Sequence, residues 1–187
     1  MSATSAPFGL RPVYSPSGVV RPAQYTILTG YATTIYMNQP VKIIPSSTGE
    51  GTIAAAAVGD RFIGAFAGVE WTDSDGRRRV SNKWTASTAG TDIVCYVTLD
   101  PSIVYEIQSN AALAITDIGK QFDFTAASGS TVVGVSTQML DVASAAANAS
   151  VRLLGITPGA DNAWGDTYVV AQVQISEHQT VADVAAF

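Results

Sequence analysis

The sequence contains one cysteine, Cys95, and one histidine, His178, the residue types that a thiolate–imidazole catalytic pair needs. Cys95 lies in the strand-like run DIVCYVTLD, which predicts a buried structural thiol and not an exposed nucleophile. One cysteine and one histidine cannot form a zinc site within the chain. The sequence has no G-x-S-x-G, Walker A or dinucleotide-binding G-x-G-x-x-G motif. We therefore expect no enzyme activity, no cofactor and no bound metal.

The stretch WTDSDGRRRVSNKW, residues 71–84, is the second place where residue types suggest chemistry. Its DSDG segment begins like a calcium-binding loop. An EF-hand needs oxygen ligands at loop positions 5 and 12, where this chain has Arg77 and Trp84. The stretch instead predicts a tight turn centred on Asp75 and Gly76 that closes a β-hairpin.

Residues 77–79 and Lys83 supply four of the ten basic residues in the chain. A sequence pI of about 4.6 is a poor electrostatic footprint for nucleic acid, so we expect no direct nucleic-acid binding. Alternate residues of a strand share a face, which places Arg77 and Arg79 together. We expect these two arginines to meet carboxylates on a neighbouring subunit.

The composition favours a protein that is covered by neighbours. Charged residues make up 13% of the 187 residues, against a usual fraction of roughly 25%. Residues 1–85 hold eight basic and five acidic residues, and residues 86–187 hold two basic and ten acidic residues. This asymmetry suits head-to-tail contacts or docking on a larger body. No apolar stretch approaches the ~18 residues of a membrane span and no signal-peptide pattern is present, so we expect cytoplasmic synthesis and no membrane insertion.

The elements that must position these residues are mostly strands. Runs rich in Val, Ile, Thr and Tyr, separated by Gly and Pro, predict an all-β fold: a compact β-barrel or β-sandwich domain over residues 25–176. Alternating apolar residues over 169–175 indicate a half-buried strand. The Asp100–Pro101 pair predicts a hairpin or sharp corner. We expect one short helix at 110–121 and a loop at 141–150.

Both ends of the chain are predicted to be extended arms, at residues 1–24 and 177–187. The N-terminal arm has four prolines, which disfavour helix and central strand, but it also carries apolar residues. It should therefore lie on its own domain or on a partner. The three tryptophans, Trp71, Trp84 and Trp164, lie next to turn signals and are expected to be core or interface anchors.

A family resemblance adds to this interpretation. The ordered segments FGLRPVYSP, YATTIYMNQPVKI, FIGAFAGVEWTDSDGRRRVSNKWTAST, YVTLDPSIVYEIQ, LAITDIGKQFDF and VRLLGI resemble head decoration proteins, or cement proteins, of tailed bacteriophages. The resemblance covers most of the chain and is clearest around residues 68–84 and in the DP…YEIQ segment. It implies a β-rich domain on the outer surface of the capsid, bound to the major capsid protein and commonly trimeric.

The resulting hypothesis is a virion protein that stabilises a phage capsid from outside, as a homotrimer. The expected contacts with the capsid or a neighbouring subunit are Phe8, Leu10, Tyr14, Arg77 and Arg79. Deleting residues 1–22 should abolish shell binding and leave the domain folded. Two alternatives stay open: a lectin-like or receptor-binding virion module, and a tail-tube or head-completion subunit.

Overall fold

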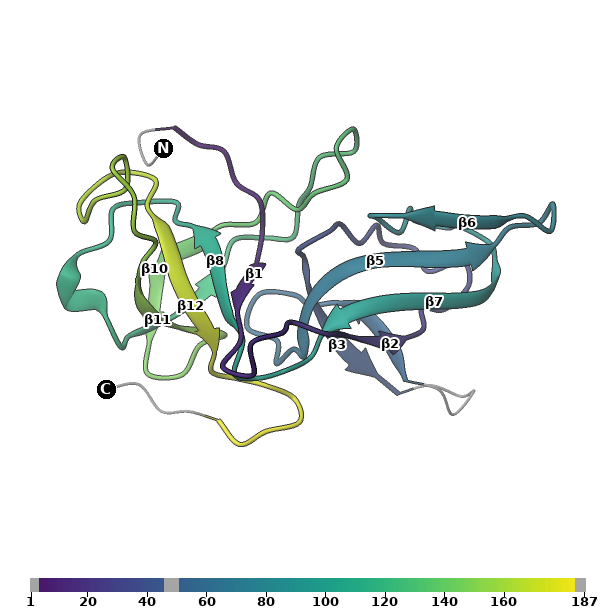
Figure 1. Ribbon diagram of the computed structural model, residues 1–187, viewed down its shortest axis with the longest axis horizontal. Helices are drawn as coiled ribbons and strands as arrows, with labels where there is room; N and C mark the ends of the chain where they lie inside the picture. The colour runs from purple at the N-terminus through teal and green to yellow at the C-terminus, as the bar shows by residue number, and fades with distance from the viewer. Residues whose placement is uncertain (1–3, 46–50, 184–187) are drawn as a thin grey trace.

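The computed structural model (Figure 1) is nearly all β, as the sequence predicts, and it describes residues 4–45 and 51–183. Twelve strands form two antiparallel six-stranded sheets. In spatial order, sheet A contains β1 (Arg11–Tyr14), β8 (Val104–Gln108), β12 (Val170–Ile175), β11 (Val151–Ile156), β9 (Gln121–Phe124) and β10 (Leu140–Ala146). Sheet B contains β2 (Pro22–Tyr25), β7 (Thr91–Thr98), β5 (Gly64–Thr72), β3 (Pro40–Ile44) and β4 (Thr52–Ala55), and β6 (Arg78–Ser81) pairs with β5.

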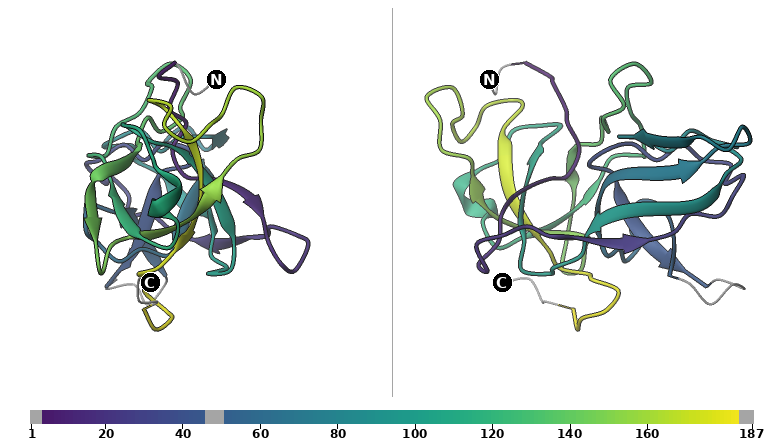
Figure 2. Two further views of the ribbon diagram at one scale, coloured as in Figure 1. Left: turned by 90° about the vertical axis from the view of Figure 1, so that its left-hand side faces the viewer. Right: turned by 45° about the vertical axis from the view of Figure 1, so that its right-hand side comes forward.

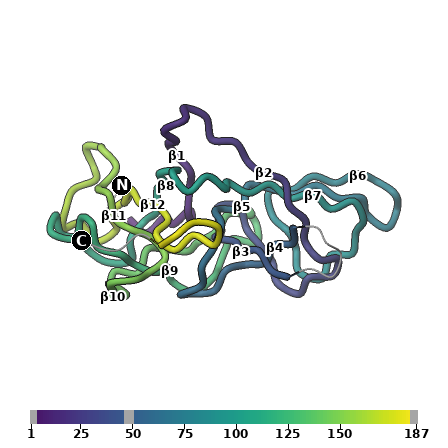
Figure 3. Tube along the Cα trace, turned by 90° about the horizontal axis from the view of Figure 1, so that it is seen from below, coloured from purple at the N-terminus to yellow at the C-terminus, as the bar shows by residue number. Residues whose placement is uncertain are grey.

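The two sheets lie side by side along the long axis and are not stacked as a sandwich (Figures 1 and 3). Each sheet curls until its ends approach each other. In sheet A a bridge joins Ser109, just after β8, to Leu140 at the start of β10. In sheet B a bridge joins Thr26, just after β2, to Thr52 at the start of β4. The residues expected to form one β-rich domain therefore contain two barrel-like sheets.

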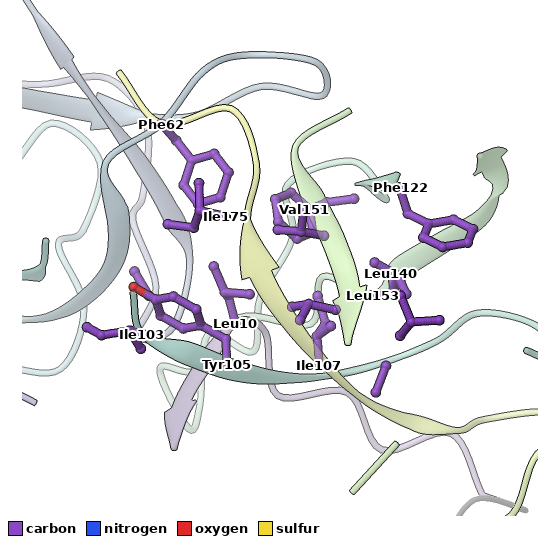
Figure 4. Close-up of a cluster of buried hydrophobic side chains, with 14 of the residues drawn as sticks. Leu10, Phe62, Ile103, Tyr105, Ile107, Phe122, Leu140, Val151, Leu153 and Ile175 are labelled. Carbon is purple, nitrogen blue, oxygen red and sulfur yellow. The ribbon is translucent and has the colours of Figure 1, made fainter. Parts of the chain in front are cut away.

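Each sheet encloses its own hydrophobic cluster. The cluster of sheet A is built around Tyr105, Ile107, Phe122, Val151 and Leu153 (Figure 4). Val169, just before β12, and the alternate residues of β12 up to Ile175 are buried, as the sequence pattern predicts.

The cluster of sheet B contains Ile53, Phe66, Val97 and the fully buried Trp84. Phe62, just before β5 of sheet B, belongs to the sheet A cluster and packs edge-on against Phe124 of β9, with ring centroids 5.6 Å apart. The two sheets therefore share a packed contact in addition to the chain that connects them.

The N-terminal segment is part of the folded unit and not an arm outside it. β1 forms an edge of sheet A next to β8, and β2 forms an edge of sheet B next to β7. Leu10 is fully buried in the sheet A cluster, and Arg11 forms a 2.5 Å ion pair with the buried Glu106. Because residues 1–22 supply an edge strand and a core side chain, we now expect their deletion to destabilise the domain, in contrast to the expectation from the sequence.

The C-terminal segment also packs on the fold as far as residue 183, and residues 184–187 of the expected tail lie outside the described residues. His178 is buried and bridges to Phe62. Its Nε2 lies 2.9 Å from the carbonyl oxygen of Ile63 and 3.1 Å from that of Leu99, so this nitrogen must carry the proton. Its Nδ1 then accepts from Thr180. The histidine thus ties the end of sheet A to segments that flank sheet B.

Two local predictions are wrong. Instead of a helix at 110–121 there is one 3-10 turn, Ile115–Asp117, because Asn110 bonds to β10 through both its backbone and its side chain. Much of the predicted loop at 141–150 is strand β10, which pairs with β9. The predicted corner at Asp100–Pro101 is confirmed, since β7 leaves sheet B there and β8 enters sheet A.

Candidate interaction surface

The β5–β6 hairpin forms where the sequence predicts it. Trp71 pairs with Arg79 and Thr72 with Arg78, and the chain turns between Asp73 and Arg77. Gly76 has φ +74°, a left-handed conformation that glycine adopts without strain. One carboxylate oxygen of Asp73 accepts from the backbone N–H groups of Asp75 and Arg77, each at 3.0 Å. The turn is therefore closed by its own side chain and needs no metal.

The arginines of the hairpin have carboxylate partners within the same chain. Arg79 Nε lies 2.6 Å from an oxygen of Asp73, and Arg78 forms an ion pair with Glu70 at 3.3 Å. The N–H of Arg77, and then the Arg79 side chain, lower the pKa of Asp73. The expectation that Arg79 needs a carboxylate on a neighbour is thus not supported, because its carboxylate partner, Asp73, lies six residues earlier in the same chain.

Arg77 differs from Arg79 in its position. It lies in the turn, before β6 begins at Arg78, and it is exposed. The expectation that Arg77 and Arg79 project from one face of a strand is therefore wrong. Arg77 stays available to a partner, and Arg79 is committed to the hairpin.

The tryptophans fix the base of the hairpin, as predicted. Trp71 and Trp84 pack edge to face with ring centroids 5.7 Å apart, and Trp84 is fully buried. Trp164 is partly buried against the sheet A cluster. An exposed sugar-stacking platform at Trp84, which a lectin-like module would need, is absent because sheet B covers the ring.

The three N-terminal candidates have different environments. Leu10 is core and cannot contact a partner without unfolding. Phe8 is half-buried, with the Arg11 guanidinium 4.4 Å from its ring centroid. Tyr14 is 58% exposed on β1. Tyr14 lies in β1 of sheet A, and Phe8 and Leu10 lie just before it. The β5–β6 hairpin, which carries Arg77 and Arg79, lies at the far end of sheet B (Figure 1), so the structure does not bring the five candidates together.

A further surface was not identified from the sequence. The loop of residues 128–136, between β9 and β10, leaves sheet A and reaches the end of β6, on the same side of the molecule as the N-terminal segment (Figures 1 and 2). Its tip carries Val132 and Val133, which are 92% and 64% exposed. Val80 of β6 is 79% exposed. We call Val80, Val132 and Val133 the valine surface.

The 128–136 loop is held in place by sheet B. Asn82 Nδ2 donates to the carbonyl oxygen of Val133 at 2.8 Å, and Lys83 donates to that of Thr131. Gly134, with φ +78°, lies so close to the Asn82 side chain that a Cβ there would be 2.4 Å from its oxygen. The adjacent valines in SGSTVVGVS, between two glycines, were a usable signal for an exposed apolar turn, but its contact with β6 was not predictable.

Cys95 and His178, the residues that could form a catalytic pair, both have structural surroundings. Burial raises the pKa of the Cys95 thiol to about 12, so the thiol stays protonated at neutral pH. Both ring nitrogens of His178 already have hydrogen-bond partners. In the described part of the chain, no group of three or more His, Cys, Asp or Glu residues is placed to hold a metal ion.

Compared with protein-family models, curated proteins and solved structures, the chain matches none. Over residues 4–45 and 51–183, none of the helices is long and apolar enough to cross a membrane.

Proposed function

We propose that this chain is a virion structural protein that decorates the outer surface of a tailed-phage capsid and stabilises it by binding the major capsid protein shell. The phage-specific part of the proposal rests on the sequence resemblance to head decoration proteins. The structural observation that supports a binding role is the valine surface. Three apolar side chains are exposed there on a braced loop and strand, where their exposure to water has no role in the fold.

The proposal includes self-association as a homotrimer, with synthesis in the host cytoplasm and assembly on the finished shell. The composition supports this part, because a chain with 13% charged residues has much neutral surface that neighbours can cover. Light scattering at two concentrations measures the solution mass. A species of three times 19.4 kDa is expected, and a monomer at both concentrations would remove the preformed trimer from the proposal.

The direct test uses capsid shells of the encoding phage that lack this chain. Purified protein is mixed with shells, and bound protein is measured after sedimentation. We expect saturable binding at a fixed number of copies per capsomer, and a higher temperature of shell disruption. Purified tails and shells of an unrelated phage are the controls. Absence of binding to the cognate shells would reject the decoration role, and binding to tails alone would favour a tail subunit.

A further inference from the structure

The outer edge of β6 has no strand partner in the part of the chain that the structure describes. β6 pairs with β5 alone and lies at the upper side of sheet B, away from β2 (Figure 1). An exposed strand edge carries N–H and C=O groups at the spacing of a β-ladder. Such an edge is a template for another extended chain.

The register shows which residues of β6 present these groups. Asp73 donates from its N–H to the carbonyl oxygen of Arg77 at 3.0 Å, so this pair is hydrogen-bonded. In an antiparallel ladder, hydrogen-bonded and non-hydrogen-bonded pairs alternate. The pairs of Arg78 with Thr72 and of Val80 with Glu70 are therefore non-hydrogen-bonded pairs. The backbone groups of Arg78 and Val80 point away from β5.

Charged side chains usually protect an exposed edge strand from pairing, but the guanidinium groups of β6 are directed away from its outer edge. Arg78 reaches across the sheet, donating to the backbone oxygen of Asp92 at 2.7 Å and pairing with Glu70. Arg79 turns toward Asp73. Both guanidinium groups are neutralised over the faces of the hairpin, so they leave the edge open and add no net charge to it.

The apolar side chains indicate the character of the occupant. Asn82, in the bend just after β6, donates to the backbone oxygen of Val133, so the loop tip lies beside the end of β6, which carries Val80. A strand added to β6 would run toward the 128–136 loop. Its apolar side chains would pack beside Val80 and, past the end of β6, beside Val133.

We propose that the outer edge of β6 and the tip of the 128–136 loop bind an extended, uncharged segment with alternating apolar side chains, by strand addition. The capsid protein shell as the source of that segment rests on the proposed function. The inference that the edge binds such a segment rests on the geometry of the edge alone. A second copy of this chain is the competing occupant.

Three variants test the edge. Val80→Pro removes an outward N–H and leaves the ladder with β5 intact. Val133→Lys places a charge at the loop tip. Val58→Lys is the matched control, because Val58 is 52% exposed in the turn between β4 and β5, apart from the valine surface. Near-UV circular dichroism confirms that each variant is folded.

The first probe is a capped peptide of about eight residues in which valine and threonine alternate between terminal lysines. At about 1 mM peptide, a Kd of about 0.25 mM would leave roughly one-fifth of the sites free, so amide exchange of Arg78 and Val80 should slow about fivefold. A peptide with proline in place of threonine should have no effect. Unchanged exchange with the first peptide would overturn the inference. Protection that grows with protein concentration alone would assign the edge to a second copy and overturn it as well.

The second probe is the cognate shell. Val80→Pro and Val133→Lys should each weaken shell binding at least about fivefold, and Val58→Lys should bind like the wild type. If the wild type binds shells and Val80→Pro binds equally well, the strand-addition site is wrong and the decoration role stands. If the wild type does not bind shells but the peptide protects Arg78 and Val80, the site stands and the decoration role is wrong.

Discussion

Replacing Leu10 with alanine tests whether the N-terminal segment is part of the fold. Leu10 is fully buried among the side chains of sheet A (Figure 4). The change removes three buried carbons, about 2.4 kcal/mol at ~0.8 kcal/mol each. The unfilled cavity raises the loss in the free energy of unfolding to about 3–5 kcal/mol. With a urea m-value of about 2 kcal/mol per M, the midpoint should fall by roughly 2 M.

Tyr14→Ala is the matched control on the same strand. More than half of the Tyr14 side chain is exposed, so its loss should cost less than about 1 kcal/mol. Urea denaturation followed by far-UV circular dichroism measures both variants. In a Trp164→Phe background, which removes the tryptophan at the sheet A cluster, fluorescence of Trp71 and Trp84 reports on sheet B. Equal midpoints for the two variants would refute the assignment of Leu10 to the core. A shift in the circular dichroism midpoint without a shift in Trp84 fluorescence would show that sheet A unfolds separately.

Three further predictions concern the core and the contact between the sheets. Gly64→Ala should destabilise the protein by at least about 4 kcal/mol, because its Cβ would lie 1.6 Å from the backbone oxygen of Thr98; Gly155→Ala, with open space around it, is the control in thermal denaturation. The thiol of Cys95 should resist a disulfide reagent at pH 8 until the protein unfolds. Because burial raises its pKa from 9.0 to about 12, its contribution to stability is complete below about pH 9 and is lost as the pH rises toward 12. In urea titrations between pH 7 and 11, Cys95→Val should therefore lose less stability than the wild type, while the loss from Tyr25, Tyr96 and Tyr105, whose pKa values are also raised, is common to both. His178→Ala removes bonds to two buried backbone carbonyls and should cost about 2–4 kcal/mol, and an unchanged urea midpoint would contradict the role given to this ring.

The predictable parts of the fold are those with local signals. Alternation over residues 169–175 identified β12, and the Asp-Gly turn at 75–76 identified the β5–β6 hairpin. The corner at 100–101 was readable from one dipeptide. In each case a residue's neighbours in the chain determine its conformation.

The parts that were wrong depend on distant partners. Asn110 is a good helix cap by type, but its side chain bonds to Asp141 and Val142 of β10, which draws the segment to sheet A. The same pairing makes a strand of the alanine-rich 140–146 run. Of the five contact candidates, Leu10 was assigned to an interface although it is in the core. In a proline-rich segment, an apolar residue that packs in its own domain has the same sequence signal as one that packs on a partner.

The charge of the hairpin shows why residue types alone mislead about partners. The arginine run suggests an electrostatic contact, yet Asp73 and Glu70 neutralise two of its guanidinium groups locally, and Arg77 lies in the turn, outside strand β6. What remains at the hairpin edge is backbone and valine. A surface of this kind binds through ladder geometry and burial of apolar area, which salt hardly screens, and not through long-range charge. Low charge over the whole chain and local neutralisation in the hairpin thus point to the same mode of binding, in which shape and not net charge selects the partner.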